Sequence, residues 1–127
     1  MFTQRAGIVA ISQRPPEVDR MIAAFRQRRD ALVAGLNTIA GVTCRTPRGA
    51  FYVFPNVTGL RLGDAATVAG RILAEAGVAC LAGTAFGAQG EGHLRLSYAN
   101  SLENLELAVQ RIADWATAAR AAAPARA

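Results

Sequence analysis

A long run of apolar residues at helical spacing, with two prolines before it and a glycine after it, constrains the fold most. From Glu17 onward the apolar side chains recur at this spacing as far as Ile39. They therefore lie on one face of an amphipathic helix. The two prolines just before Glu17 interrupt any helix that begins earlier, and Gly41 is a typical helix terminator. The sequence predicts a long helix over 17–39, preceded by the end of a separate segment.

The remainder of the chain alternates short strand-like segments with two more helices. Asp64 is a suitable N-cap for a helix that closes at Gly77, and Ser101 with Glu103 predicts a capped final helix through Ala119. Segments typical of strands lie at 42–45, 50–54, 78–81 and 94–98. The order of these elements predicts one α+β domain, in which helices cover one face of a small, mostly antiparallel sheet.

Composition supports a folded chain and argues against a nucleic-acid surface. With 127 residues, 52% of them hydrophobic, the chain is long enough to bury the core of one domain. Its net charge of +5 permits contact with nucleic acid, but basic residues are dense only at Arg26, Arg28 and Arg29, with Arg20 nearby. Acidic residues are interspersed there, so a solvated helix face explains the patch better. All fourteen basic residues are arginine, and none is lysine.

Cysteine usage and hydropathy indicate a cytoplasmic protein without a membrane partner. Cys44 and Cys80 lie far apart and form no metal-ligand spacing, so we expect reduced, buried thiols rather than a disulfide or a metal site. No apolar stretch approaches the length that crosses a bilayer, and the first residues contain no sustained apolar segment.

The most informative single side chain is that of Arg95, in an alternating run over 94–98. The alternation places Arg95 on the face opposite three apolar side chains, those of Leu94, Leu96 and Tyr98. A permanently charged guanidinium on a rigid element needs an anion. That anion is either a substrate carboxylate, held through two parallel hydrogen bonds, or a structural partner drawn from Glu91, Glu103 and Asp114. From the residues alone, the two alternatives carry equal weight.

The residues around Arg95 have structural explanations, and for some of them a role in a ligand site is the alternative. His93, the single histidine, has no partner at a spacing typical of a general base, so we predict that it is structural. Ser97 shares the face of Arg95 and either meets the same ligand or satisfies backbone groups. Tyr52 and Phe51 are predicted to pack on the sheet, with a cleft wall as the alternative. The glycines over 83–92 lead into a strand without a lysine, which predicts turns rather than a phosphate cradle.

Three sequence blocks resemble a known family. They are Gly-Ala-Phe-Tyr-Val-Phe-Pro at 49–55, Leu-Ala-Gly-Thr-Ala-Phe-Gly at 81–87, and Gly-Glu-Gly-His-Leu-Arg-Leu-Ser-Tyr-Ala at 90–99, followed by Ser101 and Glu103. In this order they resemble the C-terminal small domain of class I/II, fold-type I pyridoxal-phosphate aminotransferases of the aspartate aminotransferase kind. Residues 4–8 resemble the helix that leaves the large domain. Ala82 stands where many relatives carry proline, a departure that affects a turn.

The resemblance implies a function and a division of the chain. It implies that Arg95 binds the α-carboxylate of an amino acid substrate, and that the intact parent is a homodimer that exchanges amino groups between amino acids and 2-oxo acids. It divides the chain into a remnant of the large domain and its connection (1–16), the small domain (17–120) and a frayed tail (121–127). In the family, the lysine that binds pyridoxal 5'-phosphate lies upstream. We therefore expect no catalytic, cofactor-binding or metal-binding residue in this chain, and no activity from it alone.

An alternative stays open beside the enzyme hypothesis. The chain is then a non-catalytic carboxylate-binding or regulatory module derived from such a domain. A third and weaker hypothesis, a basic nucleic-acid-binding domain, predicts binding that falls steeply with salt.

Overall fold

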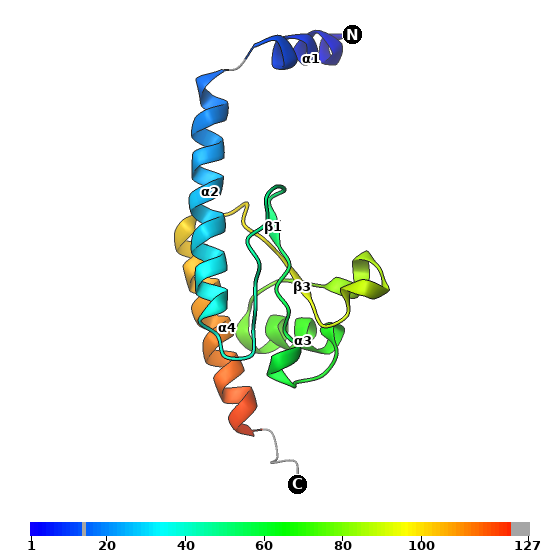
Figure 1. The fold of residues 1–127 in the computed structure, drawn as a ribbon, viewed down its shortest axis with the longest axis vertical. Helices are drawn as coiled ribbons and strands as arrows, with labels where there is room; N and C mark the ends of the chain where they lie inside the picture. Colours follow the sequence, from blue (N-terminus) through cyan, green and yellow to red (C-terminus); the bar gives the residue numbers. More distant parts are fainter. Residues whose placement is uncertain (14, 123–127) are drawn as a thin grey trace.

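The computed structural model describes residues 1–13 and 15–122, in which two long helices pack beside a small sheet and a shorter helix (Figure 1). The helices are α1 (Phe2–Ser12), α2 (Pro16–Asn37), α3 (Ala65–Arg71) and α4 (Leu102–Ala122). The strands are β1 (Tyr52–Val53), β2 (Leu81–Ala82) and β3 (Leu94–Ser97). Short helical turns connect them: η1 (Thr58–Leu60), η2 (Ile72–Ala76), η3 (Gly83–Phe86) and η4 (Ala88–Gly90). The predicted α+β class is confirmed.

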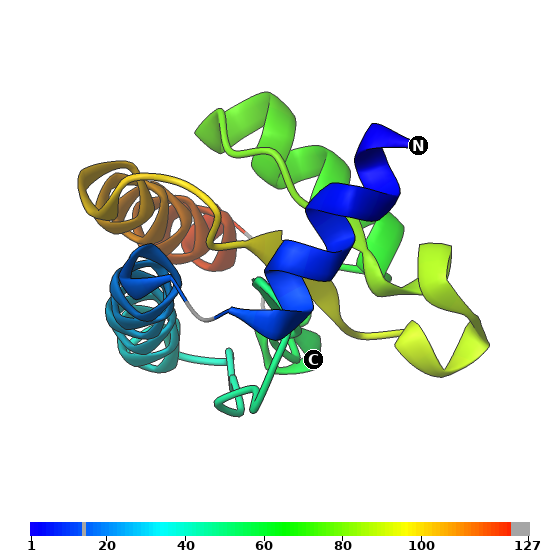
Figure 2. The ribbon, with the colours of Figure 1, turned by 90° about the horizontal axis from the view of Figure 1, so that it is seen from above.

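Helix α2 confirms the long helix predicted over 17–39 and ends two residues earlier. Pro16 occupies its first turn, where a missing N–H costs nothing, and the acidic Glu17 and Asp19 favour the positive end of the helix dipole. Figures 1 and 2 show α2 lying beside α4. Gly35 allows this approach, because a Cβ there would lie 2.8 Å from Cγ1 of Val109. Both helices contribute buried apolar side chains to the core, among them Leu32, Leu36, Leu105, Ile112 and Trp115.

The sheet is antiparallel throughout, with the strand order β1-β3-β2. Tyr52 lies opposite Ser97, and Leu81 lies opposite Arg95. The predicted alternation along β3 is confirmed, because three apolar side chains are buried on one face: Leu94, Leu96 and Tyr98. The opposite face carries Arg95, which is half-buried.

The strand predicted over 42–45 does not form as a strand. Thr43 makes one isolated bridge with Asn56, and the next residue pairs with a side chain instead of a strand. The Oδ1 atom of Asn37 accepts from the Cys44 N–H at 2.8 Å, and its Nδ2 donates to the Cys44 carbonyl at 2.9 Å. The Asn37 amide thus satisfies both backbone groups that a neighbouring strand would otherwise bind.

The strand predicted over 50–54 is shortened to Tyr52–Val53. Pro55 follows closely and has no N–H to donate to a ladder. Its carbonyl still accepts from the Leu94 N–H at 3.0 Å, so the chain stays beside β3 without regular pairing.

Helix α3 is capped as predicted and is tied to α4 through one polar cluster. Asp64 accepts a hydrogen bond from the Thr67 N–H at 2.8 Å, which lowers the pKa of Asp64 below its ordinary value. In η2, Glu75 pairs with Arg71 at 2.8 Å and accepts from the Trp115 indole N–H at 2.8 Å. The hydrogen bond from Arg71, and then that from Trp115, lowers the pKa of Glu75.

Helix α4 begins at the predicted Ser101 cap, although the partners differ from a standard capping box. The Ser101 Oγ accepts from the Asn104 N–H at 3.2 Å. Glu103 hydrogen-bonds with its own backbone N–H and with the Ser101 side chain, and these bonds lower its pKa. The helix runs to Ala122, and the rest of the tail expected to fray, 123–127, lies outside the described residues.

Helix α1 stands apart from the other elements, beyond the N-terminal end of α2 (Figure 1). None of its residues is buried, and Phe2, Ile8 and Ile11 are exposed. Within residues 1–13 and 15–122, no helix combines the length and the apolar character needed to cross a lipid bilayer.

Candidate functional site

Arg95 lies on the central strand of the sheet, on the face opposite the buried apolar residues. Strand β3 is hydrogen-bonded to β1 on one side and to β2 on the other. A backbone paired on both sides holds its side chains in fixed directions, so the central strand sets where the Arg95 side chain leaves the sheet.

Aromatic rings surround the Arg95 guanidinium. Its Cζ atom lies 4.5 Å from the ring centre of Tyr52 and 5.2 Å from that of Phe86. Together with Phe54, these residues line a pocket of about 260 Å³. Cation–π contacts of this kind orient a guanidinium without consuming its N–H donors. The guanidinium is therefore held in position, and its N–H donors stay available to a ligand.

The structural ion pairs considered for Arg95 do not form in the described part of the chain. Glu91 uses its Oε1 atom to accept from the N–H groups of Ala65 and Gly92, each at 2.9 Å. Glu103 is engaged at the α4 cap, and Asp114 is exposed on α4. No carboxylate among residues 1–13 and 15–122 pairs with Arg95. Of the two alternatives drawn from the sequence, the internal ion pair is not formed by these residues.

The glycine-rich segment positions Phe86 through close backbone contact. The Gly83 N–H donates to the His93 carbonyl at 2.7 Å, and a Cβ on Gly83 would overlap the carbonyl of Gly90. The turns η3 and η4 therefore pack backbone against backbone, which only glycine permits. The predicted turns are confirmed, and they carry Phe86 to the Arg95 pocket.

His93 occupies a structural position, in agreement with its predicted role. Its Nδ1 lies 2.9 Å from the Glu91 carbonyl, which can only accept, so Nδ1 carries the proton and donates. Its Nε2 then faces the Asn56 amide at 3.4 Å. The imidazole also stacks on Phe54, with 5.4 Å between ring centres. His93 therefore packs against Phe54, one of the residues that line the Arg95 pocket.

The remaining candidates separate into pocket and backbone roles. Tyr52 lines the pocket, which was the alternative considered for it, whereas the Ser97 Oγ donates to the Phe51 carbonyl at 3.4 Å and accepts from the Ala99 N–H. Sequence reasoning missed Phe86. The signal for it was present, because a large aromatic residue in a loop, between Gly83 and Gly87, has little core to pack into.

The two cysteines are unpaired, and the chemistry around them does not activate either one. Burial raises the pKa of Cys44, and it raises the pKa of Cys80 to about 11. Among residues 1–13 and 15–122, no three histidine, cysteine, aspartate or glutamate side chains gather as metal ligands would.

Comparison with known sequences decides the family. The family described as "Aminotransferase class I and II" matches residues 2–112. The chain belongs to this aminotransferase family. Aspartate aminotransferase from Musicola paradisiaca is 42% identical over 117 residues, which cover 91% of this chain and 29% of the relative. LL-diaminopimelate aminotransferase from Oleidesulfovibrio alaskensis is 41% identical over 112 residues, or 87% of this chain and 28% of the relative.

Solved aminotransferase structures share the fold. The aspartate aminotransferase from Rhizobium meliloti superposes with a TM-score of 0.79 at 35% identity, over 90% of this chain and 30% of that one. The alanine aminotransferase from Pyrococcus furiosus gives a TM-score of 0.83 at 28% identity, over 89% and 29%. The chain thus spans less than a third of the length of the relatives that it matches.

Proposed function

We propose that this chain supplies the small, C-terminal domain of a pyridoxal-phosphate aminotransferase, and that Arg95 binds the α-carboxylate of its substrate. The intact enzyme would transfer an amino group between an amino acid and a 2-oxo acid. Residues 17–120 form the small domain in this proposal, and residues 1–16 are the end of the large domain and its connection. The observation that supports the proposal is the Arg95 guanidinium, which faces an aromatic pocket without an internal carboxylate.

The physical argument concerns how a planar cation holds a carboxylate. A guanidinium offers parallel N–H bonds that match the two oxygens of a carboxylate, so it sets both the position and the tilt of the bound acid. The rings of Tyr52 and Phe86 displace water from one side of Arg95. Less water lowers the local dielectric constant and strengthens the charge-assisted bonds. Orientation of the substrate is then the contribution of this chain to catalysis.

The cofactor that the family implies is not held covalently by this chain. Pyridoxal 5'-phosphate would supply the electron sink for amino-group chemistry, and a lysine side chain would hold it covalently. None of the 127 residues is lysine. The proposal therefore assigns to this chain substrate binding and no catalytic or cofactor-binding residue, and it expects no transamination by the chain alone. The intact enzyme is proposed as a homodimer in the cytoplasm, where unpaired thiols such as Cys44 stay reduced.

A binding experiment on the chain itself tests the role of Arg95. Propionate and its neutral analogue propionamide are titrated while the ring signals of Tyr52 and Phe86 are followed by NMR. We expect shifts with propionate only, and none in Arg95→Gln. Arg111→Gln, which removes an exposed arginine from α4, is the matched control and should respond as the unchanged chain does. If propionate shifts the ring signals equally in Arg95→Gln and in the unchanged chain, Arg95 does not bind the carboxylate.

A complementation experiment tests the enzymatic part. An aspartate aminotransferase that lacks the segment matched by this chain is produced together with the chain, and transamination is assayed. We expect activity to return, with the KM for the amino acid raised about 10–100-fold in Arg95→Gln, because hydrogen bonds to charged groups contribute roughly 1.5–3 kcal/mol. A failure to restore activity, combined with intact propionate binding, would favour the carboxylate-binding module, which the absence of lysine also permits.

A further inference from the structure

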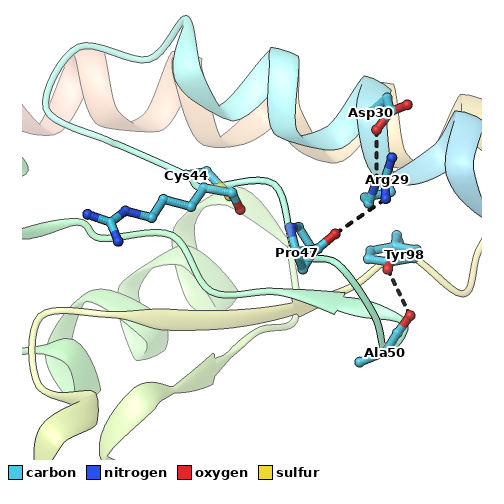
Figure 3. A network of polar contacts seen from close by, with 7 residues as sticks. Arg29, Asp30, Cys44, Pro47, Ala50 and Tyr98 are labelled. Carbon is cyan, nitrogen blue, oxygen red and sulfur yellow. Dashed lines mark hydrogen bonds and ion pairs between the residues drawn. The ribbon is translucent and has the colours of Figure 1, made fainter.

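A second pocket lies between α2 and the loop over 47–51, away from Arg95. Its volume is about 360 Å³, and it shares no lining residue with the Arg95 pocket. Its walls combine three arginines and three aromatic rings: Arg26, Arg29, Arg48, Phe25, Phe51 and Tyr98. Figure 3 shows Arg29 on α2, with Pro47, Ala50 and Tyr98 around the same loop.

The charge of this pocket is positive, and one of its cations is held in place. Among residues 1–13 and 15–122, no acidic side chain lines it, although Asp30 pairs with the lining residue Arg29. The Nε of Arg29 donates to Asp30 at 2.7 Å and its Nη1 donates to the Pro47 carbonyl at 3.3 Å (Figure 3). These bonds use two of the five N–H donors of a guanidinium, and the remaining donors are available to a ligand. Arg26 and Arg48 are exposed and form no ion pair within the described part of the chain.

The aromatic residues that line this pocket are Phe25, Phe51 and Tyr98, and contacts hold two of them in place. Phe25 meets Tyr98 edge to face with 6.0 Å between ring centres, and the Tyr98 hydroxyl donates to the Ala50 carbonyl at 2.8 Å (Figure 3). Ala50 has φ 64°, a left-handed conformation that is costly for a residue other than glycine and that recurs at ligand sites. Phe51 remains 50% exposed at the edge of the pocket. A ring surface is thus open to a flat apolar group.

We propose that this pocket binds a small organic anion whose acidic group is attached to a planar ring. The guanidinium groups of Arg29 and Arg48 hold the acidic group, and the ring lies against the exposed Phe51. The arginine patch predicted as a solvated helix face therefore divides: Arg20 pairs with Glu17 at the surface, whereas Arg29 faces the pocket. The proposal does not depend on Arg95 or on transamination.

Calorimetric titration of the full chain at about 0.15 M salt tests this proposal with three probes: phenyl phosphate, inorganic phosphate and benzyl alcohol. We expect phenyl phosphate to bind at least about tenfold more tightly than inorganic phosphate or benzyl alcohol, because it makes both the contacts to the arginines and the contacts to the aromatic ring. Arg48→Gln, at an exposed position where folding is not at risk, should weaken phenyl phosphate binding about tenfold.

Two matched variants make the outcome decisive. Arg48→Gln and Arg111→Gln each remove one positive charge, but Arg111 lies outside the pocket, so Arg111→Gln should leave the affinity for phenyl phosphate unchanged. An equal loss in Arg48→Gln and Arg111→Gln would mean that only net charge matters, and the proposed site would be wrong. Equal affinity for phenyl phosphate and inorganic phosphate would refute the aromatic half of the pocket.

Discussion

Replacing Asn37 by alanine tests whether one side chain substitutes for a strand. Asn37 supplies an acceptor to the Cys44 N–H at 2.8 Å and a donor to the Cys44 carbonyl at 2.9 Å. Each hydrogen bond contributes about 0.5–1.5 kcal/mol net, so the two together contribute about 1–3 kcal/mol. Alanine returns up to about 0.7 kcal/mol through its higher helix propensity. The difference is about 0.3–2.3 kcal/mol, and we expect Asn37→Ala to lower the free energy of unfolding by about 1–2 kcal/mol, near the middle of that range.

Urea unfolding, followed by circular dichroism, measures this loss, and hydrogen exchange locates it. The Cys44 amide should exchange faster in Asn37→Ala, because water replaces its acceptor. Gln27→Ala is the control, since it removes an exposed polar side chain from the same helix and should change stability by less than about 0.5 kcal/mol. If the two variants unfold at the same urea concentration and Cys44 exchange is unchanged, Asn37 does not hold the segment in place.

Three substitutions and one measurement of thiol reactivity test other parts of the structure. Gly83→Ala forces a Cβ against backbone carbonyls and should cost at least about 1–3 kcal/mol by urea unfolding, whereas Gly7→Ala meets no neighbour and should not destabilise the domain. The lowered pKa of Glu75 means that its stabilising contribution is present above the ordinary glutamate pKa of about 4.3 and is lost as pH falls through the lowered value. The stability difference between the unchanged chain and Glu75→Gln, measured by unfolding at pH 7 and pH 3, should therefore shrink in acid. Cys80, with a pKa of about 11, should react slowly with Ellman's reagent at pH 8 until urea unfolds the chain. Tyr98→Phe removes a hydrogen bond to Ala50 and should lower stability by about 0.5–1.5 kcal/mol in thermal unfolding, while loosening the loop over 47–51.

The helices were predictable because their signals are local. Proline before α2, Asp64 before α3 and Ser101 before α4 each act within one turn of their own position, and the structure shows each helix beginning there. The alternation in β3 was equally readable, since burial follows a period of two along a single strand.

The short strands were harder to predict because pairing partners lie far away in the sequence. Cys44 pairs with a side chain from α2, and the segment after Val53 follows β3 without a regular ladder. Composition rich in β-formers described these segments correctly as extended, but it carries no information on which groups fill their hydrogen bonds.

The sequence by itself determined where the helices begin, the buried face of β3 and the presence of an arginine opposite that face. It also contained the motifs that relate the chain to aminotransferases, because the order of motifs can be read directly from the linear sequence. Only the tertiary structure decided what Arg95 meets. Phe86 lies over the guanidinium because the backbones of Gly83 and Gly90 pack against each other. Glu91 does not pair with Arg95, because its carboxylate accepts a hydrogen bond at the start of α3. Whether a charge is neutralised depends on distances between residues from separate elements, and those distances exist only after the elements have packed.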